Sequence, residues 1–459
     1  MKTKLPLIIS FILLYTFTIK ASEKYNKENR PNFVIIYCDD LGYGDLACFG
    51  HPTIKTPNLD KMAIEGQKWT SFYVSASVCS PSRAGLLTGR LGVRTGMFGN
   101  KFRVLFPNSP EGLPQSEITI AKELHKKNYI TACIGKWHLG HHFESMPIQN
   151  GFDYFYGAPF SNDMSKKEQA KIGNKKYPYE YLIYDQNTVV AKDPDQTQLT
   201  SMFTQKAISF IQENKRNPFF LYLAHPMPHF PVYSSNAFQG KSARGPYGDT
   251  VEEIDWSVGQ ILKTLEENNL EKNTLVIFTS DNGPWLIKKE LGGSAGLLRE
   301  GKGSICEGGF RVPCIMWGGM VKPGQITDMG STLDLFPTFC DMADIKMPED
   351  RQYDGVSLKN VITQKTLTKR KMFYYYRGND LYAIRKGAYK IFFAYKPAYG
   401  KTPKIVYKNP CLYNLEHDPE ARYDIAYKYP ELVKELVAYK IKYLKNTVSK
   451  ASIFDITKK

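Results

Sequence analysis

The sequence predicts an α/β fold in which helices cover a large sheet, followed by a smaller C-terminal antiparallel sheet with one helix. Up to about residue 345, short apolar runs typical of fully buried strands alternate with helical segments. Beyond that point, short segments rich in Tyr and Lys are punctuated by Gly, Asn and Pro, which is typical of antiparallel strands. The length of 459 residues allows two or three domains with ample core.

The first 22 residues are typical of a secretory signal peptide. Two lysines precede an apolar run over residues 5–18, and the small residues Ala21 and Ser22 follow it. A membrane anchor is the competing interpretation, but the run is short for a bilayer and Lys20 closes it. We therefore expect an exported protein without a membrane span in the mature chain, located in a periplasmic, secreted or lysosome-like compartment.

The elements expected in the first part of the chain follow one another in a regular order. Strands buried on both faces are continuous apolar runs, and the first two helices open at Thr56 and Ser116, which can cap a helix N-terminus. In chain order, we expect a strand at 33–37, helices at 56–65, 116–127 and 197–214, a strand at 219–223, a helix at 249–268 and a strand at 275–278.

The C-terminal part of the chain is expected to form a small α+β unit. It contains four short strand-like segments and then an amphipathic helix at 430–445. The strands are expected at 372–376, 381–385, 389–395 and 412–414. We place the boundary near residue 365, which gives an N-terminal domain over 23–365 and a C-terminal subdomain over 366–459.

The chain is basic, with a formal net charge of +16 that comes mainly from scattered lysines. A basic exported protein could meet nucleic acid, an anionic membrane or a sulfated polysaccharide. The sequence has no arginine–aromatic platform that favours nucleic acid, so we expect no nucleic-acid partner. Eight cysteines in a chain of this length do not make a disulfide scaffold.

The most informative segment is CSPSRAGLLTGR at residues 79–90. Pro81 suits the start of a helix and an apolar helical run follows it, so the thiol of Cys79 is expected at a helix N-terminus. Free backbone N–H groups and the helix dipole favour binding of an anion at a helix N-terminus. The guanidinium group of Arg83 adds a positive charge with paired N–H donors. For the pentapeptide alone, a buried structural cysteine in front of a helix is the alternative interpretation.

Polar residues follow three of the expected buried strands, where the ligand sites of open α/β sheets lie. They are Asp39 and Asp40 after the first strand, His225 and His229 after the second, and Asp281 and Asn282 after the third. The carboxylate and amide oxygens are hard donors of the kind that Ca²⁺ and Mg²⁺ prefer. Each acidic pair taken alone is more typical of a turn, but their joint occurrence with the cysteine motif favours a metal site.

The cysteine motif, C-x-P-S-R followed by L-T-G-R, resembles the signature of the formylglycine sulfatases. The resemblance extends over DDLGYGDLACFGHPTIKTPNLD (39–60), GKWHLG (135–140), SDNGP (280–284) and GLLREGKGSICEGGFRVP (296–313), in the branch of arylsulfatase A and N-acetylgalactosamine-6-sulfatase. It implies an alkaline-phosphatase-like fold, with a large mixed sheet between helices, and hydrolysis of sulfate monoesters. It also implies oxidation of Cys79 to formylglycine by a formylglycine-generating or anaerobic sulfatase-maturating enzyme, with Ca²⁺, or alternatively Mg²⁺, as cofactor.

The resemblance also implies roles for individual residues. The implied metal ligands are Asp39, Asp40, Asp281 and Asn282. The implied catalytic residues are Cys79, Arg83, Lys136, His138, His229 and Lys302. Ser161 and His225 are candidates for contact with the substrate; the APFSND loop around Ser161 matches the family loosely. His225 departs from the arylsulfatase A pattern, which makes His229 the stronger candidate for the catalytic position.

These implied roles form a consistent catalytic cycle. A formylglycine hydrate supplies the oxygen that attacks sulfur, and the lysines neutralise charge on the sulfuryl oxygens. His229 would protonate the departing alkoxide, and His138 would deprotonate the second hydroxyl so that sulfate leaves and the aldehyde returns. The expected substrate is a sulfated saccharide of a glycan, with galactose or N-acetylgalactosamine weakly favoured.

Two alternatives stay open at this stage. One is a phosphate or phosphonate ester hydrolase on the same scaffold; Lys136, His138 and Lys302 favour sulfate, because phosphate is usually served by a second metal. The other is a glycan-binding protein whose Cys79 is never oxidised. Arg103 and Arg299 are candidates for contact with a sugar carboxylate or hydroxyl, and a role outside the site is the simpler interpretation for both.

Overall fold

The computed structural model describes residues 30–456, and the predicted signal peptide lies outside these residues. The larger of its two sheets has 11 strands in the order β10-β2-β9-β8-β1-β7-β3-β4-β5-β6, with β11 paired to β2. The strands are β1 (Asn32–Cys38), β2 (Gln67–Tyr73), β3 (Ile130–Lys136), β4 (Tyr154–Ala158), β5 (Leu182–Asp185), β6 (Thr188–Lys192), β7 (Phe219–Ala224), β8 (Thr274–Ser280), β9 (Arg311–Trp317), β10 (Gly324–Ile326) and β11 (Gly330–Ser331). The sheet is mixed, because β1 is parallel to β7 and β8 whereas β9 is antiparallel to β8.

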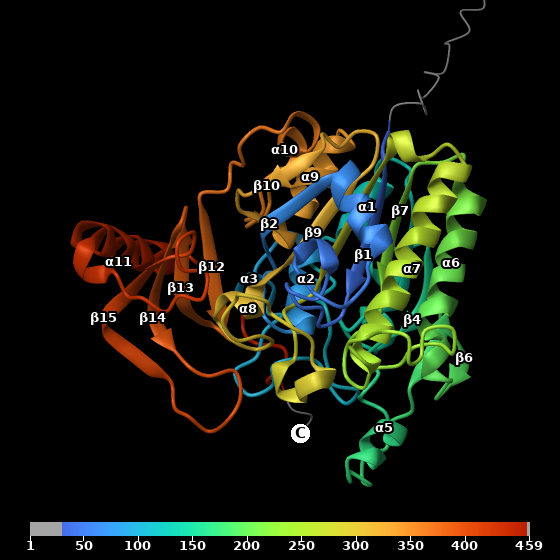
Figure 1. The fold of residues 1–459 in the computed structure, drawn as a ribbon, viewed down its shortest axis with the longest axis horizontal. Coiled ribbons are helices and arrows are strands. Elements are labelled where there is room, and N and C mark those ends of the chain that lie inside the picture. Colours follow the sequence, from blue (N-terminus) through green and yellow to red (C-terminus); the bar gives the residue numbers. More distant parts are fainter. Residues whose placement is uncertain (1–29, 457–459) are drawn as a thin grey trace, which may run out of the picture.

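Helices cover both faces of this sheet (Figure 1). On β1, Val34 and Ile36 belong to the apolar cluster under α6 and α7, while Phe33 and Ile35 belong to the cluster under α2, α4 and α9. This division follows from the two-residue period of a strand. The helices are α1 (Pro57–Glu65), α2 (Cys79–Thr88), α3 (Gly92–Thr95), α4 (Ile120–His125), α5 (Lys166–Lys171), α6 (Leu199–Asn214), α7 (Pro246–Glu267), α8 (Glu307–Phe310), α9 (Leu335–Met342) and α10 (Lys359–Gln364).

The second sheet is antiparallel, in the order β12-β13-β14-β15, and the helix α11 packs on its outer face (Figure 1). Its elements are β12 (Met372–Arg377), β13 (Asp380–Lys386), β14 (Tyr389–Tyr395), β15 (Ile405–Asn414) and α11 (Pro430–Lys445). The predicted fold class is therefore confirmed, whereas the boundary near residue 365 stays a prediction. In the described part of the chain, the structure has no helix that combines the length and the apolar character needed to span a bilayer.

The predicted strands at the centre of the sheet are confirmed to within two residues at each end, but one helix was misplaced. The helix predicted from residue 116 begins at Ile120, because the side chain of Thr119 accepts the backbone N–H of Lys122 at 3.1 Å and so caps it. Glu117 lies before this helix, where its buried carboxylate pairs with Arg90 at 2.5 Å. A tertiary ion pair therefore shortens a helix that the local sequence would start earlier.

A buried carboxylate joins the two sheets. Glu307 of α8 accepts hydrogen bonds from Tyr375 of β12 at 2.7 Å and from Lys390 of β14 at 3.0 Å, and Tyr73 of β2 donates at 2.5 Å. Burial alone would raise the pKa of Glu307, but Lys390 and the nearby arginines hold it at about 2. This carboxylate therefore stabilises the fold at pH values above 4.5, its usual pKa. The contribution is lost as the pH falls toward 2.

Replacing Lys390 with Met should lower the free energy of unfolding by about 3–5 kcal/mol, because it removes the cation that is hydrogen-bonded to the buried Glu307. Chemical denaturation at neutral pH measures this loss. Lys386→Met is the matched control. Lys386 is exposed and pairs with Glu435 at the surface, so this variant should lose less than about 1 kcal/mol of its free energy of unfolding. Equal losses in the two variants would contradict the role assigned to Glu307.

Candidate active site

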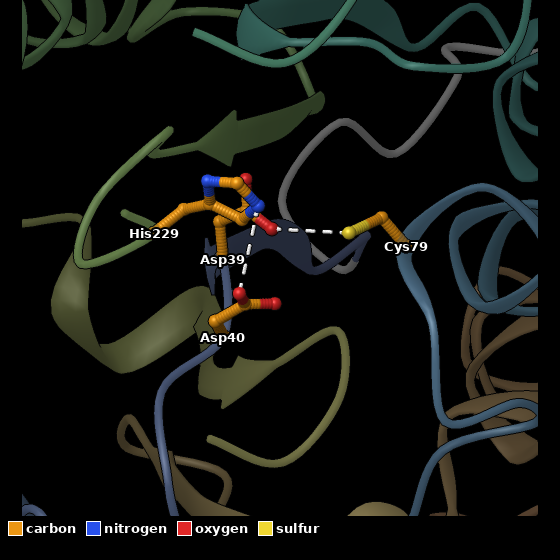
Figure 2. Close-up of side chains that lie close together, drawn as sticks. All are labelled: Asp39, Asp40, Cys79 and His229. Atoms are coloured by element: carbon orange, nitrogen blue, oxygen red, sulfur yellow. Dashed lines mark hydrogen bonds and ion pairs between the residues drawn. The ribbon is translucent and has the colours of Figure 1, made fainter. Parts of the chain in front are cut away.

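The polar residues predicted to form a site meet at the carboxyl ends of the central parallel strands. Asp39 and Asp40 directly follow β1, Asp281 directly follows β8, and Lys136 ends β3. Figure 2 shows Asp39, Asp40, Cys79 and His229 turned toward one another. One potential ligand atom from each of these four lies within 4.8 Å of those of the other three, and all four residues are buried.

Cys79 is the first residue of α2, with Val78 as the residue that precedes the helix. The predicted helix N-terminus is confirmed, although Pro81 is the third helical residue and not the first. The thiol lies 3.4 Å from Oδ1 of Asp39 (Figure 2). Burial, Asp281 and Asp39 raise the pKa of Cys79 well above its usual value, so the unmodified thiol is neutral here and a poor nucleophile.

Three buried cations pair with Asp39, Asp40 and Asp281. Arg83 donates to Oδ2 of Asp281 from Nη2 at 2.7 Å and from Nε at 3.0 Å. Lys302 Nζ donates to Oδ2 of Asp40 at 2.8 Å. The remaining ion pair joins Lys136 and Asp39. Because each negative charge has a positive partner, the site can be buried without an uncompensated charge.

The remaining predicted residues occupy different surroundings. Ser161 lies in the site, where its Oγ is 3.1 Å from Nζ of Lys136. His229 Nε2 lies 3.5 Å from Oδ2 of Asp40. Burial and then Lys302 hold the pKa of His229 well below its usual value, so its imidazole is neutral in the ligand-free site. His138 has a left-handed backbone with φ of 59° and its Nε2 is 2.9 Å from the carbonyl oxygen of Leu105.

His225 contacts α7. Its Nε2 lies 3.1 Å from Oγ of Ser257 on α7, and burial lowers the pKa of His225 to about 4. None of the carboxylates or cations of the site contributes to that shift. The structure therefore gives His225 a partner outside the site, and its predicted contact with substrate stays a prediction.

The donor set fits a hard divalent cation. Asn282 donates from Nδ2 to Oδ1 of Asp40 at 2.7 Å, and its Oδ1 is buried without a hydrogen-bond partner among the described residues. A buried amide oxygen left free beside carboxylates is the arrangement expected of a ligand for Ca²⁺ or Mg²⁺.

Three residues that the sequence did not single out also border the site. The Trp285 ring lies 5.2 Å from the His229 ring and 4.5 Å from Nζ of Lys302. Tyr399 lies 6.5 Å from Trp285 between ring centroids, and Asp163 has a buried, unpartnered Oδ1. Trp285 directly follows the SDNGP motif and could have been noticed there. Tyr399 comes from the C-terminal sheet region, so no local signal connects it with the site.

Comparison with known proteins decides the family. The Sulfatase family model matches residues 31–345, and the model for the C-terminal region of aryl-sulfatase matches residues 368–458. The chain belongs to the sulfatase family.

Individual sulfatases resemble this one over most of its length. N-acetylgalactosamine-6-sulfatase of Mus musculus is 41% identical over 371 residues, which cover 78% of this chain and 71% of that one. Arylsulfatase A of Homo sapiens is 37% identical over 425 residues, covering 86% and 83%. The crystal structure of the PsFucS1 sulfatase from Pseudoalteromonas sp. superposes with a TM-score of 0.82 at 26% identity, covering 94% and 92%. The expected fold and activity are thus confirmed: this sulfatase is a sulfuric ester hydrolase.

Proposed function

We propose that this sulfatase removes sulfate from a sugar of a glycan, using formylglycine made from Cys79 and a divalent cation held by the acidic cluster. The observation that supports this most strongly is the position of Cys79: it starts a helix, and its Sγ lies 3.4 Å from a carboxylate that is itself paired with a lysine. An aldehyde hydrate at this position supplies an oxygen nucleophile at the anion-binding end of the helix. Its formation requires a maturation enzyme of the formylglycine-generating or anaerobic class.

The proposed metal ligands are Asp39, Asp40, Asp281 and Asn282. When bound, Ca²⁺ or Mg²⁺ supplies positive charge that stabilises the sulfate group. Arg83, Lys136 and Lys302 already pair with Asp281, Asp39 and Asp40, so a divalent cation adds positive charge that favours the anion of a sulfate ester. This arrangement favours sulfate esters over phosphate esters, because enzymes that hydrolyse phosphate esters usually bind two metal ions.

The proposed catalytic roles of the side chains follow from their contacts. Arg83 is fixed by two hydrogen bonds to Asp281 and by one to the carbonyl oxygen of Lys136 at 3.1 Å, so its charge is held in place before substrate arrives. Lys136 and Lys302 would neutralise charge on the sulfuryl oxygens. The negative charge of a bound sulfate ester raises the pKa of His229, which can then give its proton to the departing oxygen. His138 is proposed as the base that completes the cycle.

The proposed substrate is a sulfated sugar, with galactose or N-acetylgalactosamine favoured. The likeness to N-acetylgalactosamine-6-sulfatase supports this choice. Trp285 adds a physical reason, because its half-buried aromatic ring stands beside His229, where a sugar ring would lie. We also propose export of the protein, with residues 23–365 as the catalytic domain and 366–459 as its C-terminal subdomain.

Sulfate release from a panel of monosulfated saccharides tests the substrate class, and mass spectrometry of the peptide that contains Cys79 tests the modification. Sulfate release together with the aldehyde mass supports the proposal. An active protein whose peptide carries an intact thiol would contradict the formylglycine mechanism.

Replacing His229 with Ala separates the acid role from a structural one. The loss in kcat/KM should reach about a hundredfold or more on a sugar sulfate, whose alkoxide needs a proton, and should be much smaller on a nitrophenyl sulfate. His225→Ala is the matched control, because His225 contacts Ser257 and should show no dependence on the leaving group. Equal losses on both substrates for His229→Ala would reject the acid role.

A further inference from the structure

A basic cleft of about 530 Å³ opens between the segment after α2 and the C-terminal sheet. Five cationic side chains and one carboxylate line it: Lys101, Arg103, Arg377, Lys396, Lys404 and Asp380. Asp380 forms an ion pair with Lys404. The other four cations have no ion pair with a carboxylate of the described residues, so this basic cleft carries an excess of positive charge.

Arg103 and Arg377 are held in place by backbone and not by acids. Arg103 donates to the carbonyl oxygen of Ala398 at 2.9 Å, and Arg377 donates to those of Lys396 at 2.8 Å and Pro397 at 2.9 Å. Burial and the neighbouring Arg377 lower the pKa of Arg103 to about 10. Two guanidinium groups fixed side by side repel each other, and an anion between them would relieve that repulsion.

The basic cleft borders the active site. Ser77 and Val78, which directly precede Cys79, form part of its lining. Tyr399 also lines it; Arg103 lies 5.7 Å from the Tyr399 ring, and that ring lies 6.5 Å from Trp285. Trp285 in turn borders His229. Trp285 and Tyr399 therefore lie between His229 and the cleft, on the side where we expect a saccharide with its sulfate beside Cys79 to extend.

We propose that the basic cleft binds a second anionic group, a sulfate or a carboxylate, carried by the sugar next to the one that is desulfated. This inference rests on the proposed sugar-sulfatase function and narrows its substrate class to polyanionic glycans. Planar guanidinium groups suit both anions, because each presents paired N–H donors to two oxygens. The cleft then selects substrates by charge at a distance from the reacting sulfur.

Binding to three matched saccharides tests this proposal. Each carries the same sulfated sugar, and its neighbour is neutral, sulfated or a uronic acid. Dissociation constants are measured by calorimetry on the Cys79→Ser protein, so that turnover does not interfere. At least one of the charged neighbours should bind about tenfold tighter or more than the neutral one, and the comparison of the two shows which anion the cleft prefers.

Arg377→Gln should reduce this advantage severalfold or more. Lys396→Gln provides a second variant, because this half-buried lysine lines the cleft without a carboxylate partner among the described residues and its loss should not disturb the fold. Lys434→Gln is the matched control; it removes the same charge from an exposed lysine on α11. The ratio of affinities for the charged and the neutral saccharides should be the same in Lys434→Gln as in the parent protein.

Equal affinity for the three saccharides would overturn the proposal, as would an advantage that survives both Arg377→Gln and Lys396→Gln. These outcomes are separate from a failure of the proposed function, which is measured on the unsubstituted protein as sulfate release. A protein that binds the charged saccharides more tightly but releases no sulfate would refute the sugar-sulfatase proposal and leave the second anion site supported.

Discussion

Replacing Cys79 with Ser is expected to lower kcat for sulfate esters by at least about a thousandfold, in a host that cannot oxidise serine. The serine hydroxyl fits the space of the thiol at the start of α2, so the fold and the ion pairs around it should persist. What is lost is the aldehyde and the oxygen nucleophile that its hydrate supplies. The measurement is sulfate release at saturating substrate, together with the melting temperature as a check of the fold.

Cys411→Ser is the matched control for this variant. Cys411 is a half-buried cysteine on β15, and the same chemical change there should leave kcat within about twofold. A kcat of Cys79→Ser within tenfold of that of the unsubstituted sulfatase would contradict the formylglycine mechanism.

Replacing Asp281 with Asn should remove most of the bound Ca²⁺ or Mg²⁺ and lower kcat by about a hundredfold or more, because a hard anionic ligand is lost beside the reacting group. Asparagine is preferred to alanine here. Arg83 donates two hydrogen bonds to one oxygen of Asp281, and alanine would remove this charged partner from a buried guanidinium. Metal content by elemental analysis and sulfate release are measured on the same preparation.

Asp255→Asn serves as the control, because Asp255 is also a buried acid but binds backbone N–H groups at the start of α1. It should keep its metal. If Asp281→Asn were inactive and still held its full complement of metal, the assignment of Asp281 as a ligand would be wrong.

Much of the site could be anticipated because local sequence and sheet geometry act together. The runs that form β1 and β8 are apolar throughout, since both faces of these strands are covered, and this marks where each strand ends. The acidic residues that follow must then meet at one edge of a parallel sheet. Cys79 and Arg83 lie four residues apart and so fall on the same side of a helix.

The alternation of side chains along β7 also explains why His225 and His229 differ. Leu221 and Leu223 point toward α6 and α7, whereas Tyr222 points toward the α2 face. His225 continues the register of Leu221 and Leu223, which directs it toward Ser257 of α7. This signal was present in the sequence as a period of two. The alternation does not apply to His229, because His229 lies in the loop beyond the strand.

Other features could not be anticipated, because they depend on contacts between distant segments. Tyr399 reaches the active site from a loop between β14 and β15, and Arg377 reaches the basic cleft from the end of β12. Neither has a local pattern that marks it. The start of α4 was misjudged for the same reason, since a partner far along the chain fixes Glu117.

The buried carboxylate of Glu307 has a consequence for biosynthesis. Glu307 lies five residues after Lys302 in the same segment, but its partners Tyr375 and Lys390 are synthesised later. While the chain emerges from the ribosome, the catalytic half holds a carboxylate that it cannot yet neutralise in full. The two partners Tyr375 and Lys390 therefore reach Glu307 only when β12 and β14 have been made. A chain cut short before β14 would contain every proposed catalytic residue and still leave the buried Glu307 without Lys390.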